Sequence, residues 1–268
     1  MATDRWVGLE RDGATATIVL DRPDAGNAWT LESARQIVEV AEQLRFDSDV
    51  RAVIVRAEGP AFCAGTDLAD LESKVVGRSA GEKVRNWFEH LRWLHERLST
   101  LAHLPQPVIM AIQGSCLGSG LELAMMGDLR VAANDAEFGL PEPQFGFPPE
   151  TGGELRLAEE TGPGWAKLLA FTGRRLDARS ALRIGIVQEV VTPEELLSTV
   201  RDLAAEIANN APLAVQGIKR TINSVAEQGL ADAMRFEAIG ASLCLVSDDM
   251  REGLRARSAG AAANFGGA

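Results

Sequence analysis

Short β-branched segments that alternate with helical patterns restrict the fold of this chain more than any other feature. The predicted strands span residues 14–20, 52–56, 107–112 and 129–133. Thr30 is expected to cap a helix over residues 33–44, and apolar residues at helical spacing continue through residues 71–100. From about Pro193 onward the pattern is helical, over residues 196–207, 213–226 and 231–245. Alternation followed by a run of helices predicts an α/β core with a C-terminal helical extension.

The length and charge of the chain narrow its organisation and its partners. With 268 residues it can bury a full core, and we expect a core over residues 1–195 with a helical region over 196–268. The last stretch, residues 258–268, is rich in small residues and is expected to be loose. The net charge of −11 argues against nucleic acid as the main partner, because no broad basic field is present. A few local Arg and Lys residues can still hold the phosphate of a small ligand.

The compartment and the metal chemistry are expected from what the sequence lacks. No apolar run is long enough to span a bilayer, and the N-terminus has no apolar signal segment, so we expect no membrane association. The three cysteines are widely spaced and form no Cys/His cluster, so neither a disulfide framework nor a zinc site is expected. A reducing cytoplasm is the expected compartment.

A glycine-rich turn over residues 114–122 carries the strongest chemical signal. It follows a predicted strand and precedes a helix, so its glycines allow close ligand approach and the helix start offers unpaired N–H groups. An anion or a developing oxyanion is the natural occupant. Leu123 occupies the place of the third glycine of a dinucleotide motif, and Leu117 the place of the first glycine of a nucleophile elbow. A close-packed turn without a ligand stays open as the alternative.

Two further stretches gain meaning beside this turn. Residues 61–67 again follow a predicted strand, and two glycine-containing strand exits can aim two backbone N–H groups at one carbonyl. Residues 138–142 and the following prolines form a structured loop that ends with Glu150. Glu142 stands between two prolines, and without further context a solvated loop residue is the favoured interpretation.

Taken together, these segments resemble the crotonase superfamily, the enoyl-CoA hydratase/isomerase family. The matching stretches are residues 20–28, 61–68, 107–128, 137–142, 172–174, Ala178, 185–190 and 247–253. The resemblance implies an α/β fold, a crotonase-like spiral of β-β-α units with a C-terminal helical trimerisation region. It also implies a homotrimer or a dimer of trimers.

The resemblance assigns roles residue by residue. It implies an acyl-CoA substrate whose thioester oxygen accepts hydrogen bonds from the backbone N–H groups of Thr66 and Ser119, the second position being usually glycine. The paired hydratase carboxylates fall on Glu122 and Glu142, which would orient a water for addition at Cβ and deliver a proton to Cα. No metal and no redox cofactor is implied, since coenzyme A is part of the substrate. The predicted substrate-binding positions are Arg22, Ala64, Asp67 and Gly118.

One departure from the hydratase pattern leaves the reaction open. Glu150 lies where hydratases usually have glycine, whereas dienoyl-CoA isomerases carry an acid there that partners the one matching Glu142. Glu122 is aspartate in those isomerases. The first hypothesis is therefore an enoyl-CoA hydratase, the second a dienoyl-CoA or other enoyl-CoA isomerase that uses Glu142 and Glu150, and the third a non-catalytic acyl-CoA-binding protein. Glu150 has a third option, since it can face solvent or pair with Arg156.

Overall fold

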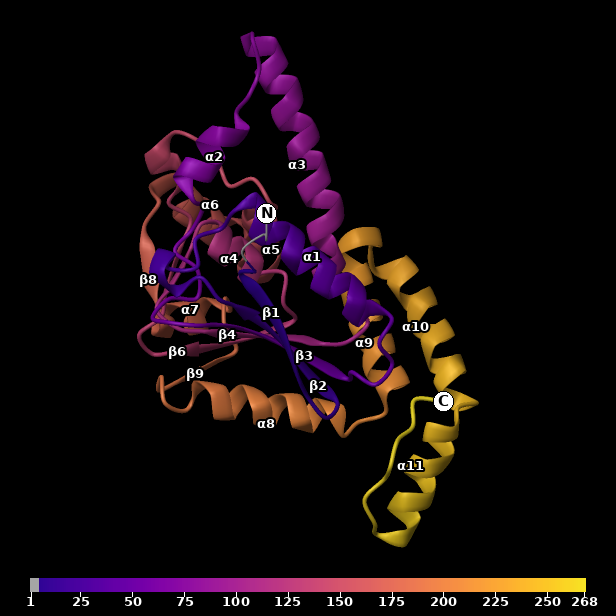
Figure 1. Cartoon of the computed structure of the whole chain (residues 1–268). Coiled ribbons are helices and arrows are strands. Elements are labelled where there is room, and N and C mark those ends of the chain that lie inside the picture. Colours follow the sequence, from indigo (N-terminus) through magenta and orange to yellow (C-terminus); the bar gives the residue numbers. More distant parts are fainter. Residues whose placement is uncertain (1–4) are drawn as a thin grey trace.

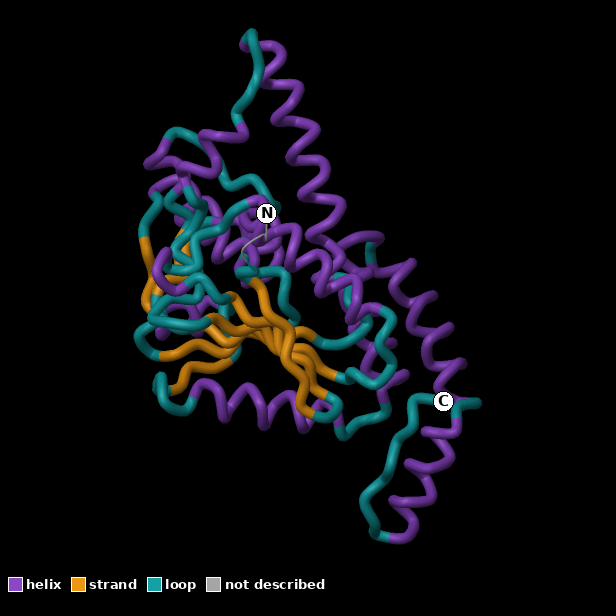
Figure 2. The backbone as a smooth tube through the Cα atoms, viewed as in Figure 1, coloured by secondary structure: helices purple, strands orange, loops and turns teal. Residues whose placement is uncertain are grey.

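The larger of two sheets forms the centre of the molecule. The computed structural model describes residues 5–268. Its six-stranded sheet runs in the order β1-β2-β3-β4-β6-β9, with β1 antiparallel to β2 and every other pair parallel (Figure 2). The strands are β1 Val7–Asp12, β2 Thr15–Leu20, β3 Ala52–Ala57, β4 Val108–Ile112, β6 Leu129–Ala133 and β9 Glu189–Val191. All residues of β4 are buried, as expected of a parallel strand covered on both faces. The four predicted strands are confirmed, whereas β1 and β9 were not predicted.

A second, three-stranded sheet lies beside the first and was not predicted. It contains β5 Ser115–Leu117, β7 Glu137–Gly139 and β8 Arg175–Asp177. β5 follows β4 and β7 follows β6, so successive strands alternate between the two sheets. β5 and β7 are parallel neighbours, as β4 and β6 are in the large sheet. The chain therefore winds as a spiral of strand pairs, and the expected fold class is confirmed.

Helices surround these sheets and extend beyond them. The helices are α1 Leu31–Arg45, α2 Leu68–Lys74, α3 Ala80–Ala102, α4 Ser119–Ala124, α5 Gly153–Thr161, α6 Pro163–Thr172, α7 Ala178–Ile184, α8 Leu196–Ala208, α9 Pro212–Gln228, α10 Leu230–Leu245 and α11 Asp248–Ala259. Thr30 caps α1 as predicted. Its side chain accepts a hydrogen bond from the backbone N–H of Ser33, and the Ser33 side chain accepts one from the backbone N–H of Thr30. The helical pattern of residues 71–100 is confirmed, although the chain forms two helices there, α2 and α3, which residues 75–79 separate.

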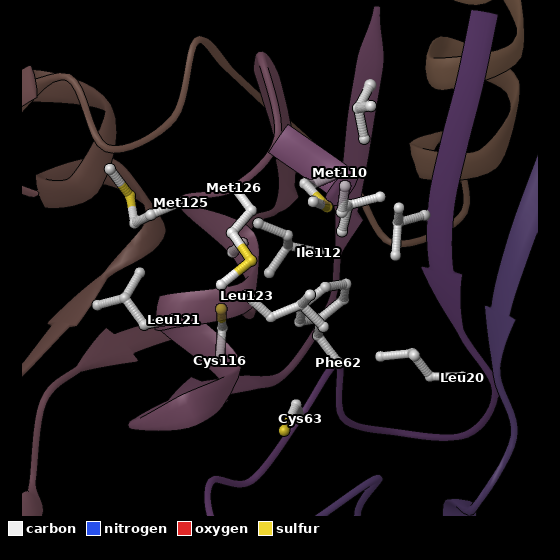
Figure 3. Packing of buried hydrophobic residues seen from close by; sticks show 14 of the residues in the cluster. Leu20, Phe62, Cys63, Met110, Ile112, Cys116, Leu121, Leu123, Met125 and Met126 are labelled. Carbon is white, nitrogen blue, oxygen red and sulfur yellow. The ribbon is translucent and has the colours of Figure 1, made fainter. Parts of the chain in front are cut away.

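Apolar side chains fill both faces of the large sheet. On one face, Met110 and Ile112 of β4 pack with Phe62, Cys116 and Leu123 behind the glycine-rich turn (Figure 3). On the other face, α8 lies along the sheet with its buried residues against the opposite side chains of β3, β4 and β6 (Figure 1). The sheet is thus the middle of three layers, and the turn that ends β5 is backed by a packed core.

The helices beyond α8 leave the layers that cover the sheet, although Lys219 of α9 still contacts Asp128 at the end of the sheet. α9 and α10 pack against each other, and α11 points away from the α/β body (Figure 1). The expected helical extension is confirmed, although its first helix, α8, belongs to the sheet's own layers. The division at residues 195 and 196 stays a prediction.

The expectation of a loose C-terminal tail is wrong. Asp249 is buried and its carboxylate accepts the backbone N–H groups of Gly266 and Gly267. The guanidinium of Arg51 donates to the carbonyl of Phe265. Gly267 has a φ of 79°, a backbone conformation that favours glycine.

Candidate functional site

Two strand exits lie side by side, as the spacing of the glycines predicted. The loop that follows β3 pairs with β5 through Cys63 and Cys116, and the N–H of Leu117 donates to the carbonyl of Cys63 at 3.0 Å. A Cβ added at Gly120 would lie 2.5 Å from that carbonyl oxygen, so only glycine allows α4 to begin this close to the loop.

Thr66 and Ser119 carry the two predicted backbone donors. The residues on either side of Thr66 pair with the backbone of Trp29. The N–H of Trp29 donates to the carbonyl of Gly65, and the N–H of Asp67 donates to the carbonyl of Trp29, each at 2.8 Å. This pairing leaves the N–H of Thr66 without a partner in the described part of the chain. Ser119 is the first residue of α4, where helix N–H groups have no intrahelical acceptor. The two side chains are joined by a hydrogen bond of 2.6 Å between their hydroxyl oxygens.

Glu122 is held inside the protein by one oxygen only. Its side chain is fully buried, and Oε1 accepts the backbone N–H groups of Thr151 at 2.8 Å and Gly153 at 3.1 Å. Its other oxygen has no partner among the described residues. A Cβ at Gly153 would lie 2.3 Å from Cγ of Glu122, so the glycine makes room for the carboxylate. Burial raises the pKa of Glu122, while the two backbone hydrogen bonds oppose that rise.

Glu142 begins the short 3-10 helix η2, Glu142–Phe145, directly after β7 and Pro141. It is 3% exposed, yet both of its carboxylate oxygens lack a hydrogen-bond partner among residues 5–268. Oε1 lies against Gly118, where an added Cβ would approach it to 2.8 Å. Burial, reinforced by the negative charge of Glu122, raises the pKa of Glu142 to about 7.

Glu150 lies near this pair and is half-buried. Burial, together with the charge of Glu122, raises its pKa to about 7, against a hydrogen bond from Trp87. Its backbone carbonyl is bonded to Nε2 of His95 at 2.6 Å. The ion pair with Arg156 is not formed, because that guanidinium donates to the carbonyls of Thr151 and Gly152 instead. Glu150 therefore has no cation partner among the described residues, and its carboxylate interacts with Trp87 and with the charge of Glu122.

A fourth acid, Glu154, was missed in the sequence. It lies in the first turn of α5, its Oε2 is buried without a partner among the described residues, and its charge raises the pKa of both Glu122 and Glu142. An acid in the first turn of a helix is common for electrostatic reasons, so the residue type alone gave no signal. A helix predicted to begin at Gly153 would have drawn attention to it.

The remaining predicted substrate contacts lie around the loop after β3. Arg22 pairs with Asp67 at 2.9 Å and places its guanidinium 4.7 Å from the ring centre of Trp6. Asp67 also caps α2, and the N–H of Asp70, with Arg22, lowers its pKa. Ala64 is exposed and donates its N–H to Gly26 at 2.9 Å. Gly118 precedes the backbone donor Ser119 and lies against Glu142, so it lies between that donor and the Glu142 carboxylate.

Two properties follow from the described residues as a whole. Over residues 5–268, no helix combines the length and the apolar character that crossing a bilayer requires. Within the same range, no three His, Cys, Asp or Glu side chains are grouped so that they could hold a metal ion.

Comparisons with known proteins agree on one family. The family model described as enoyl-CoA hydratase/isomerase matches residues 10–265. A short-chain-enoyl-CoA hydratase of Clostridium acetobutylicum is 35% identical over 251 residues, 92% of each chain. A mitochondrial Delta(3,5)-Delta(2,4)-dienoyl-CoA isomerase of Dictyostelium discoideum is 30% identical, over 92% of this chain and 87% of its own. The crystal structure of an enoyl-CoA hydratase from Bacillus anthracis superposes with a TM-score of 0.89 at 30% identity, covering 98% of this chain and 100% of the other.

Proposed function

The chain belongs to the enoyl-CoA hydratase/isomerase family, and from this premise we propose that it is an enoyl-CoA hydratase, which adds water across the 2,3 double bond of an enoyl-CoA thioester. The observation that carries the proposal is the pair Glu122 and Glu142. They are buried, and three of their four oxygens have no partner among the described residues. Unpaired buried carboxylates destabilise a fold, so their presence favours a catalytic role over a non-catalytic acyl-CoA-binding protein.

The backbone donors supply the first part of the mechanism. The thioester oxygen accepts the N–H groups of Thr66 and Ser119, neither of which has a competing partner among the described residues. As water adds to Cβ, negative charge develops on this oxygen in an enolate-like transition state. Fixed donors aimed at that charge lower the barrier, because they need no reorganisation during the reaction.

The carboxylates supply the proton transfers. Glu122 and Glu142 orient the water between them, and the ionised one accepts a proton from it as the oxygen bonds to Cβ. The protonated one delivers its proton to Cα, which restores the thioester carbonyl and completes the addition. The pKa of about 7 for Glu142 allows both protonation states near neutral pH, which suits acid–base exchange.

Arg22, Ala64, Asp67 and Gly118 are proposed to bind the substrate around this centre. Gly118 has no side chain, which lets the Glu142 carboxylate lie close to the backbone donors. Arg22 contacts a phosphate of the coenzyme A portion. In the free protein the carboxylate of Asp67 pairs with Arg22 in place of that phosphate. Coenzyme A enters as part of the substrate, so the proposal needs no separate cofactor and no metal.

The proposal includes a homotrimer or a dimer of trimers in the cytoplasm. Apolar side chains on α9 and α10 are mostly exposed in the single chain, among them Ile218, Ile222, Ile239 and Leu243. These side chains lie on two helices that pack against each other, and large exposed apolar patches are typical of association sites. We expect light scattering at micromolar concentration to give the mass of three or six chains, and a stable monomer would contradict this.

A specific observation also favours a second candidate, a dienoyl-CoA or other enoyl-CoA isomerase. Glu150 is half-buried beside the pair, with a pKa of about 7, and can exchange a proton at a remote carbon while Glu142 exchanges one elsewhere. This reaction requires that water be excluded from the acyl chain.

Supplying crotonyl-CoA and a 3,5-dienoyl-CoA to the protein side by side separates the two activities. We expect 3-hydroxybutyryl-CoA from the first substrate and slower or no double-bond migration in the second. Migration without any hydration would replace the hydratase with the isomerase.

A further inference from the structure

The hydroxyl groups of Thr66 and Ser119 form a pair with an unused proton. Their oxygens lie 2.6 Å apart, and either can be the donor. Two hydroxyls bring two protons, and one hydrogen bond between them uses only one. Neither hydroxyl has another hydrogen bond in the described part of the chain. One O–H is therefore left to donate elsewhere.

Covalent geometry places this O–H beside the two backbone donors. A Ser or Thr hydroxyl oxygen lies within about 4 Å of the nitrogen of its own residue, whichever rotamer it adopts. Both hydroxyls belong to the residues whose N–H groups are proposed to bind the thioester oxygen. The hydrogen bond between the two hydroxyls thus connects the two residues that carry the backbone donors. The hydroxyl proton that this bond does not use lies near both N–H groups.

The pair is not needed to hold the two segments together. The loop after β3 and β5 are already joined by backbone bonds, from Leu117 to Cys63 at 3.0 Å and from Cys63 to Ser115 at 2.9 Å. Ser119 is also 4% exposed, so its hydroxyl has little access to bulk water. A nearly buried O–H without an acceptor is unfavourable unless a ligand supplies one.

We propose that the Thr66–Ser119 hydroxyl pair donates a third hydrogen bond to the thioester oxygen, alongside the two backbone N–H groups. The inference rests on the proposed function and deepens it, because it makes this site selective for ligands with a carbonyl. Either hydroxyl can make this bond. The one that accepts the hydrogen bond from its neighbour has its own proton available to donate to the thioester oxygen. Removing one hydroxyl leaves the other able to donate, and removing both removes the third donor.

The experiment compares two ligands that the protein does not convert. Butyryl-CoA has the thioester carbonyl, whereas the thioether S-butyl-CoA lacks it. Their dissociation constants are measured by calorimetry for the parent, Thr66→Val, Ser119→Ala and the double variant. Ser198→Ala, which removes an exposed hydroxyl on α8, is the matched control and should leave both affinities unchanged.

The preference for butyryl-CoA is the ratio of the dissociation constant of S-butyl-CoA to that of butyryl-CoA. We expect this ratio to fall by about 5-fold in the double variant, which corresponds to the loss of one hydrogen bond, and by less in each single variant. Affinity for S-butyl-CoA should stay at the parental value, which also reports that the double variant is folded. An unchanged preference in the double variant, or equal losses for both ligands, would overturn the proposal. If this double variant does not fold, Thr66→Ala replaces Thr66→Val in the combination with Ser119→Ala, and an unchanged preference there is equally contrary. Because neither ligand reacts, the result does not depend on whether the protein hydrates or isomerises its substrate.

Discussion

Buried charges occur in two regions of this molecule, and the regions treat them in opposite ways. At the end of the large sheet, Lys219 of α9 donates to Asp128 at 2.7 Å and to the carbonyl of Gln106 at 3.0 Å. Arg130 of β6, 1% exposed, pairs with Glu160 and donates to the carbonyl of Gly127 at 2.7 Å. Beside the glycine-rich turn, Glu122 and Glu142 are as deeply buried and have no cation partner among residues 5–268.

This difference separates charges that stabilise the fold from charges that serve chemistry. A buried cation with a carboxylate and carbonyl partners compensates for its lost hydration. The carboxylates at the turn keep free oxygens and a raised pKa, which is unfavourable for stability and useful for proton transfer. Substitutions in the two regions should therefore change different properties.

The largest expected effect is on turnover, from Glu142→Gln. The amide keeps the shape of the side chain but cannot exchange a proton, so we expect kcat for hydration of crotonyl-CoA to fall by roughly 10²–10⁴-fold. Binding of butyryl-CoA should stay close to the parental value. Near-normal turnover in this variant would remove Glu142 from the mechanism.

The paired region should lose stability instead. Lys219→Met leaves Asp128 without its cation, and we expect the free energy of unfolding to fall by about 3 kcal/mol, the lower end for a broken buried pair. The lower end applies because the Asp128 side chain keeps 21% of its surface exposed. Urea unfolding measures the change. Adding Asp128→Asn should recover part of the loss, and a double variant less stable than Lys219→Met would argue against the pairing.

The sequence predicted one of these regions and not the other. Glu122 and Glu142 lie in stretches that resemble the crotonase superfamily, and that resemblance implied that the two carboxylates lie close together. Lys219 and Asp128 lie far apart in the chain and meet only because α9 folds back to the end of the sheet. β1 was missed because the alternation of residues 7–12 is weak, although an Asp-Gly turn links them to β2. Glu154 was missed because only the path of residues 147–153 turns it towards the other acids.

The pH dependence of stability sharpens the comparison. Glu142 has a folded pKa of about 7, above the ordinary value of 4.5, so the folded protein holds a proton that the unfolded chain has lost. This contribution to stability is fully present below about pH 4.5 and is lost as the pH rises through 7. Glu142→Gln should therefore flatten the decline in unfolding free energy between pH 5 and pH 8 by on the order of 1–3 kcal/mol. The exposed Glu189→Gln is the control, and the same decline in both variants would contradict the raised pKa.

The smallest expected effect comes from Glu150→Gly, which restores the residue usual in hydratases. We expect hydration of crotonyl-CoA to stay within about twofold of the parent or to rise, because the acid–base pair remains. Initial rates with both substrates measure the effect. If hydration is abolished, or if the parent only shifts double bonds and this variant cannot, Glu150 belongs to the reacting centre and the isomerase is the better assignment.

The most direct test of the unpaired carboxylates follows the oxygen of water into the product. The protein is incubated with crotonyl-CoA in ¹⁸O-enriched water, and the product is analysed by mass spectrometry. If Glu122 and Glu142 activate a water for addition, 3-hydroxybutyryl-CoA will carry the heavy oxygen at C3, and Glu142→Gln will form it at a small fraction of the parental rate. Recovery of crotonyl-CoA with no 3-hydroxybutyryl-CoA formed, or label incorporated at C3 equally fast by Glu142→Gln, would contradict the account.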